Sequence, residues 1–79
     1  MNEKHPHLSQ REKQVIELTS QGFSSKEIAR KLDIDFTTVE QYLFRVRKKL
    51  NAKNKTHAVF IVLSQQLISF EKAMAVSVN

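Results

Sequence analysis

Segment 36–50 carries side chains whose types and spacing suit the recognition of nucleic-acid bases. Its apolar residues recur at i, i+4, i+7 and i+11, which predicts an amphipathic helix that buries Val39, Leu43, Val46 and Leu50. The opposite face then presents Thr37, Glu40, Gln41, Phe44 and Arg45. In the major groove a glutamine amide pairs with adenine, an arginine with guanine, and a glutamate with the cytosine amine, while an apolar group contacts the thymine methyl. The face therefore has the chemistry to read base edges.

A cluster of six cations follows this face without an intervening Asp or Glu. Its members are Arg45, Arg47, Lys48, Lys49, Lys53 and Lys55. The attraction of cations to a helix C-terminus fades beyond the last turn, and this cluster extends further than that. Together with the net charge of +5, it indicates phosphate contacts. The alternative of a membrane surface is less consistent with the sequence, because the apolar stripe of this helix is needed for the core.

The composition limits the other functions that the chain can have. Its 79 residues make one small domain, and it has no cysteine and hence no disulfide or thiolate metal site. The longest apolar run, residues 58–63, is too short to cross a bilayer, and residues 1–7 lack the apolar core of a signal peptide. His5 and His7 are too few to hold a metal. We therefore expect a cytoplasmic protein without catalytic residues, metal or cofactor.

Start and stop signals divide the chain into four helices. Ser9 with Glu12, and Ser24 with Glu27, have the Ser-x-x-Glu spacing of a capping box. The first box predicts a helix over residues 10–21 that stops at Gly22. The second box begins a helix that reaches residue 32 and is followed by a turn at Asp33.

The remaining two helices begin at other capping residues. Asp35 is expected to cap the third helix, residues 36–50, and Asn54 to cap a fourth that starts at Lys55. Residues 58–63 are apolar on every side, so the surplus apolar surface is expected to pack against another subunit. The expected dimer contacts are Val59, Phe60, Val62, Leu63 and Leu67. Residues 1–7 are expected to form a flexible tail, residues 8–70 the domain, and residues 71–79 a frayed end.

The order and spacing of many residues between Leu8 and Leu63 resemble the LuxR-type (GerE-like, NarL/FixJ-like) helix-turn-helix DNA-binding domain. The most specific part is Gly22-Phe23-Ser24-x-Lys26-Glu27-Ile28-Ala29-x-x-Leu32-x-Ile34, followed by Thr38-Val39-Glu40 and Lys49-Leu50. The resemblance implies an all-α, four-helix bundle-like domain, with the third helix as recognition helix and the fourth as a dimer helix.

Functional residues follow from the resemblance position by position. The base-reading positions of the family fall on Glu40, Gln41 and Phe44, with Arg45 adjacent. The phosphate-binding positions fall on Ser25, Lys26, Thr38, Tyr42 and Lys49, to which the exposed basic face adds Lys48. The sequence departs from the family pattern at three sites: Tyr42 replaces a frequent His, Glu40 a frequent Lys or Arg, and Asp35 the usual Ser cap.

Two hypotheses of function remain open. The first is a sequence-specific regulator of transcription that binds double-stranded DNA as a homodimer in the nucleoid, with RNA polymerase or another regulator as a further partner. The second is an interaction module that heterodimerises with a full-length regulator through the fourth helix. A promoter-reading piece of a sigma-like factor is the alternative for the helix-turn-helix itself. Many family members carry an N-terminal receiver or ligand-binding domain. Because only seven residues precede Leu8, beginning with Met1, we expect a self-standing regulator rather than a fragment.

Overall fold

The computed structural model describes residues 7–68, which form four α-helices and no strand. The helices are α1 (Gln10–Ser20), α2 (Ser25–Leu32), α3 (Phe36–Leu50) and α4 (Lys55–Ser64). The predicted all-α class is therefore confirmed, and each helix begins at the expected residue. The expected frayed end at residues 71–79, the domain limit at residue 70 and all but the last residue of the expected tail 1–7 lie outside the described residues.

The two predicted capping boxes both form. Ser9 Oγ accepts from the backbone N–H of Glu12 at 3.1 Å, and Glu12 Oε1 accepts from the backbone N–H of Ser9 at 2.8 Å. Ser24 and Glu27 make the same reciprocal pair at 3.2 and 2.8 Å. Each box satisfies two donors at the start of a helix, which fixes where α1 and α2 begin.

Left-handed residues follow the first two helices where the sequence indicated, although α1 ends at Ser20, one residue earlier than expected. Gly22 has φ +96° just after α1, and the backbone N–H of Phe23 donates to the carbonyl of Leu18 at 3.2 Å, as in a Schellman motif. Asp33, with φ 56°, ends α2 and leaves only two further residues before α3. This short connection holds α2 and α3 at a fixed angle, the arrangement of a helix-turn-helix.

The caps of the last two helices differ from each other. The Asn54 side chain accepts from the backbone N–H of His57 at 2.9 Å, as predicted for the start of α4. Asp35 occupies the N-cap position of α3, but its side chain makes no capping hydrogen bond. The prediction of the position is correct, whereas the expected side-chain contact does not form. Asp35 is thus left with its favourable charge at the helix N-terminus.

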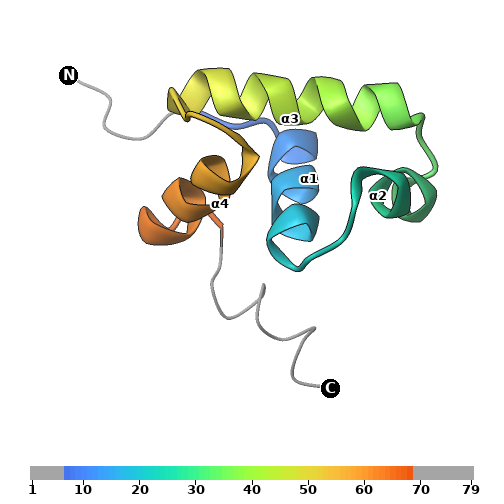
Figure 1. Ribbon diagram of the computed structural model, residues 1–79, viewed down its shortest axis with the longest axis horizontal. Helices are drawn as coiled ribbons and strands as arrows, with labels where there is room; N and C mark the ends of the chain where they lie inside the picture. The colour runs from blue at the N-terminus through green and yellow to red at the C-terminus, as the bar shows by residue number, and fades with distance from the viewer. Residues whose placement is uncertain (1–6, 69–79) are drawn as a thin grey trace.

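All three other helices pack on one side of α3. Figure 1 shows α3, the longest helix, along one edge of the molecule, with α1, α2 and α4 below it. Its side chains Val39 and Val46 are fully buried, and Leu43 and Leu50 are 9 % exposed. They meet buried residues of the other three helices, namely Val15, Ile16, Ile28 and Val62. Each fully buried side chain of this kind stabilises the fold by about 1.5–3 kcal/mol. This packing leaves the outer side of α3 uncovered.

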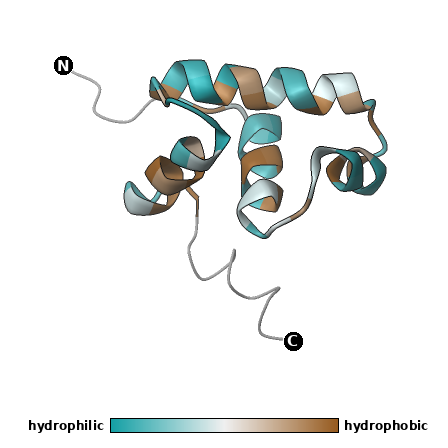
Figure 2. Cartoon of the chain, in the orientation of Figure 1, coloured by the Kyte–Doolittle hydropathy of each residue, from teal (hydrophilic) through white to brown (hydrophobic). Residues whose placement is uncertain are grey.

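Helix α4 is the most continuously hydrophobic element, as Figure 2 shows. Its residue Val62, expected at a dimer contact, is fully buried in the core of its own chain and offers no exposed surface to a second subunit. Leu67, another expected dimer contact, lies beyond α4, because the helix ends at Ser64 and Gln66 turns the chain with φ 57°. The backbone N–H of Leu67 then donates to the carbonyl of Val62 at 2.8 Å, and Leu67 packs partly against the core.

Candidate nucleic-acid interface

The uncovered face of α3 brings together all five residues expected to read bases. The side chains are exposed and line one shallow hollow formed by Thr37, Glu40, Gln41, Phe44 and Arg45. Phe44 is 54 % exposed, although a phenylalanine side chain is more often buried. A convex helix with an exposed aromatic ring and polar groups has the shape and chemistry of an element that enters the major groove.

Aromatic rings organise the cations on this face. The guanidinium of Arg47 and the ammonium of Lys48 lie 5.4 and 5.7 Å from the centroid of the Phe44 ring. The guanidinium of Arg45 lies 5.6 Å from the ring centroid of Tyr42. Contacts of this kind contribute about 0.5–1 kcal/mol each at exposed sites. They hold the positive charges close to the helix surface, where phosphates of a bound duplex would lie.

The N-terminus of α2 adjoins this exposed face of α3, called the reading face here because it holds the five residues expected to read bases. Lys26 is exposed there, while Ser25 is buried, with 7 % of its surface exposed. The Ser25 hydroxyl donates to Oε2 of Glu40 on α3. The structure thus pairs a residue expected to bind phosphate with one expected to read a base. A side chain so buried offers little surface to a phosphate, so any phosphate contact at this position falls to the backbone of α2 or to Lys26.

Lys49 forms an ion pair within its own chain. Its ammonium forms an ion pair with Oε1 of Glu12 at 2.7 Å and donates to the carbonyl of His7 at 3.2 Å. Glu12 is 3 % exposed, so the pair joins the buried start of α1 to the end of α3. Burial acts to raise the pKa of Glu12. The hydrogen bonds from Lys49 and Ser9, with the ammonium charge, outweigh burial and hold the pKa below its ordinary value.

The remaining expected phosphate contacts vary in exposure. Lys26 and Lys48 are exposed, whereas Thr38 and Tyr42 are half-buried on α3. A further depression beside the reading face is lined by Glu40, Leu43 and Phe44 of α3 and by Asn54, together with three cations: Arg47 of α3, Lys53 of the following loop and Lys55 at the start of α4. Lys53 and Lys55 extend the positive surface past the end of α3, as the cluster in the sequence indicated.

Phe36 is a candidate that the sequence reasoning missed. It is the first residue of α3 and is 47 % exposed. Recognition helices contact bases mainly through their N-terminal residues, and an apolar ring there can touch a thymine methyl. The spacing gave no signal for it, because Phe36 lies three residues before Val39 and so continues the apolar stripe of the helix.

Helix α4 carries a second exposed surface, which is apolar. Phe60 is 64 % exposed, and its ring stacks on His57 with the centroids 6.5 Å apart. Val59 and Leu63 are half-buried and pack against the core. Of the expected dimer contacts, Phe60 therefore offers the largest accessible apolar surface.

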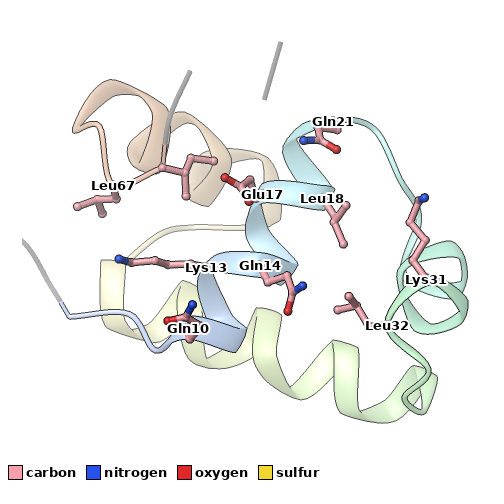
Figure 3. A pocket seen from close by; sticks show the side chains of 10 residues that line it. Gln10, Lys13, Gln14, Glu17, Leu18, Gln21, Lys31, Leu32 and Leu67 are labelled. Atoms are coloured by element: carbon pink, nitrogen blue, oxygen red, sulfur yellow. The ribbon is translucent and has the colours of Figure 1, made fainter. Parts of the chain in front are cut away.

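Another hollow lies away from α3 and is shown in Figure 3. It is lined by polar and charged side chains of α1, by Lys31 and Leu32 of α2, and by the chain after α4, and it contains no residue of α3. Its leucines belong to the edge of the hydrophobic core. Among residues 7–68 no three His, Cys, Asp or Glu side chains are grouped as a metal site would require. In the same range no helix has the length and hydropathy of a membrane span.

The amino-acid sequence of the chain is similar to those of known bacterial proteins. The sequence profile of the luxR family of bacterial regulatory proteins matches residues 6–62. The chain is 38 % identical over 63 residues to the oxygen regulatory protein NreC of Staphylococcus carnosus, a match that covers 80 % of the chain and 29 % of the relative. It is 42 % identical over 52 residues to the transcriptional regulatory protein DesR of Bacillus subtilis, covering 66 % of the chain and 26 % of DesR.

A third relative is the transcriptional activator protein BjaR1 of Bradyrhizobium diazoefficiens. It is 40 % identical over 62 residues, which cover 78 % of the chain and 26 % of BjaR1. The chain thus spans less than a third of the length of each of these three relatives.

Proposed function

The chain belongs to the luxR family of bacterial regulatory proteins, and we propose that it binds specific double-stranded DNA sequences through α3 and regulates transcription as a homodimer. The observation that carries this proposal is the uncovered face of α3, where Glu40, Gln41 and Phe44 share one exposed hollow. Each of these three types has a defined partner on a base edge.

Phosphate contacts supply affinity that does not depend on sequence. Lys26 at the start of α2 and Lys48 near the end of α3 flank the reading face and are exposed. Such contacts position a helix in the groove, and the exposed polar side chains then select the base pairs. Binding to the chromosome would place the protein in the cytoplasm, with the nucleoid.

A homodimer would use the exposed part of α4, centred on Phe60. A two-fold dimer presents two recognition helices, so its preferred DNA carries two half-sites related by inversion. Contacts with RNA polymerase or with another regulator would then translate DNA binding into activation or repression.

Selection of bound sequences from a random duplex pool tests this function. The proposal predicts enrichment of a short motif that appears as an inverted repeat. Recovery of a sequence-independent pool would contradict sequence-specific binding, and enrichment of a single half-site would contradict the homodimer.

A second candidate function is heterodimerisation with a longer regulator of the same family. The exposed Phe60 supports it, since the same surface could accept the α4 of another protein. Light scattering on the purified chain separates the candidates: a stable dimer supports self-association, whereas a monomer that pairs only when a longer regulator is added supports the second function.

A further inference from the structure

The Glu40 carboxylate is an unusual group for a surface that approaches DNA. Phosphates surround a bound recognition helix, so a negative charge on that helix lowers affinity unless it gains a specific partner. The base edge that suits a carboxylate is the amine of cytosine, which donates a hydrogen bond. The strength of this hydrogen bond depends on the direction in which the carboxylate points, because a hydrogen bond weakens steeply when its geometry is poor.

Ser25 fixes the direction of the Glu40 carboxylate, which a flexible glutamate side chain does not fix by itself. The serine lies at the first position of α2, is 7 % exposed, and donates its hydroxyl to Oε2 of Glu40, fifteen residues along the chain. Among residues 7–68 this is the single hydrogen bond of the Glu40 side chain, so Oε1 stays available to a donor outside the chain. The bond also brings the carboxylate toward the N-terminus of α2, where the helix dipole favours negative charge.

We propose that Ser25 is a positioning residue that holds the Glu40 carboxylate ready to accept from a cytosine amine, and thereby sets the preference at one base pair. The inference rests on the proposed reading of DNA by α3. It assigns Ser25 a part in specificity instead of the phosphate contact expected from the sequence. Holding one long side chain before binding removes an ordering cost that otherwise weakens the specific complex.

The test measures discrimination between the selected duplex and a duplex altered at the base pair that Glu40 reads. That pair is identified as the position whose preference is lost in Glu40→Ala. Binding is followed by fluorescence anisotropy at one salt concentration. Ser25→Ala is expected to reduce discrimination at that pair by about two- to tenfold, the range that corresponds to ordering one flexible side chain, and to leave discrimination at other pairs unchanged.

Three variants make the result specific. Ser25→Thr keeps a hydroxyl and is expected to restore discrimination. Ser20→Ala removes a hydroxyl that donates to the carbonyl of Glu17 within α1 at 2.7 Å, and is expected to have no effect on discrimination. In the Glu40→Ala background, Ser25→Ala is expected to change nothing further, because the carboxylate that it positions is gone.

Several outcomes would overturn the inference. An equal loss of affinity for every duplex in Ser25→Ala would indicate a structural or phosphate-binding role. A loss of discrimination that persists in the Glu40→Ala background would exclude action through Glu40. If Gln41→Ala alters a base preference while neither Ser25→Ala nor Glu40→Ala does so, α3 still reads DNA and only the inference fails. If the unaltered chain prefers no sequence, the proposed function fails as well.

Discussion

The exposed side chains of α3 fall into two groups that differ in what they can contact. Thr37, Glu40 and Gln41 carry short-range hydrogen-bonding groups and face the hollow. Lys48 carries a full charge on a long stem beside the Phe44 ring. Groups of the first kind discriminate between bases, whereas a cation of the second kind attracts any phosphate. Substitutions in the two groups should therefore have different signatures in binding.

Gln41→Ala should relax the preference at one base pair. The amide pairs with adenine through two hydrogen bonds, and losing them removes about 1–3 kcal/mol of discrimination. Because Gln41 is exposed and outside the core, the free energy of unfolding should change little. Competition binding with single-pair variants of the selected duplex measures the effect. The matched control is Gln10→Ala, on the exposed start of α1. An equal loss for all duplexes would refute base reading by Gln41.

Lys48→Ala and Lys49→Ala should separate phosphate binding from folding. Removal of Lys48 should lower the slope of log affinity against log salt by about 0.9, the contribution of one phosphate contact. Its effect on the free energy of unfolding should be about 0.5–1 kcal/mol, the contribution of its contact with the Phe44 ring. Removal of Lys49 leaves the buried Glu12 carboxylate without its ion-pair partner and should lower the free energy of unfolding by about 1–3 kcal/mol.

Salt titrations and urea unfolding measure these two effects. Lys13→Ala, an exposed cation on α1, serves as the control and should alter neither quantity. An unchanged salt slope in Lys48→Ala would remove this residue from the phosphate contacts. Unchanged stability in Lys49→Ala would contradict the structural role of its ion pair.

Between elements, the structure ties the start of α1 and the start of α2 to different ends of α3. The ion pair of Glu12 with Lys49 holds α1 near the end of α3, and the hydrogen bond of Ser25 with Glu40 holds α2 near its beginning. Together with the apolar packing between them, these contacts fix the orientation of α3 relative to its supports. A rigidly held helix loses less freedom on entering a groove.

The ion pair of Glu12 with Lys49 should make the free energy of unfolding depend on pH in the acidic range. Because the pKa of Glu12 in the folded chain lies below its ordinary value, the unfolded chain binds more protons between the two values. Stability therefore rises with pH across that window. The contribution is complete above the unfolded pKa and is lost as the pH falls through the folded pKa. Urea unfolding at several acidic pH values should show this loss, and Glu12→Gln should reduce it. An identical pH dependence in both proteins would contradict the role of Glu12.

The sequence predicts contacts close in the chain better than those between helices. Capping boxes and the apolar stripe of α3 are local patterns, so helix starts and the exposed reading face followed directly from them. The pairing of Ser25 with Glu40 depends on the angle between two helices, which no local pattern encodes. The same holds for Glu12 with Lys49, because these residues lie far apart in the chain.

The dimer contacts expected on α4 show a related limit of local patterns. A helix that is apolar on every side gives no periodicity from which to tell the core face from the exposed face. The sequence therefore predicts Val62 at a dimer contact, whereas the structure places its side chain in the core. The turn after Ser64 uses Gln66 in a left-handed conformation that glycine more commonly adopts, so the sequence held no clear stop signal before Leu67.

At the scale of the whole molecule, the two exposed surfaces belong to different helices. The reading face lies on α3, and the apolar surface centred on Phe60 lies on α4. A dimer through α4 would leave both recognition helices free. Two linked recognition helices bind a pair of half-sites more tightly than one recognition helix binds one half-site, because the second contact becomes intramolecular.

Phe60→Ser should weaken the proposed dimer without unfolding the chain. Removing an exposed aromatic anchor costs about 2 kcal/mol or more of association free energy, roughly thirtyfold in the dissociation constant. Sedimentation equilibrium measures the dissociation constant of the dimer. The comparison is Val62→Ala, which should lower the free energy of unfolding by about 1–3 kcal/mol because its side chain is buried. If Phe60→Ser dimerises as strongly as the unaltered chain, Phe60 lies outside the dimer interface.

The central claim, that the outer face of α3 enters a duplex groove, is tested most directly by backbone amide NMR during titration with the selected duplex. The account predicts that the largest shift changes fall on residues 36–45, with smaller ones at the start of α2. Amides of Gln10, Lys13 and Gln14 on the exposed side of α1 should stay almost unchanged. Saturation of binding with α3 unperturbed, and with the principal changes on α1 or α4, would contradict it.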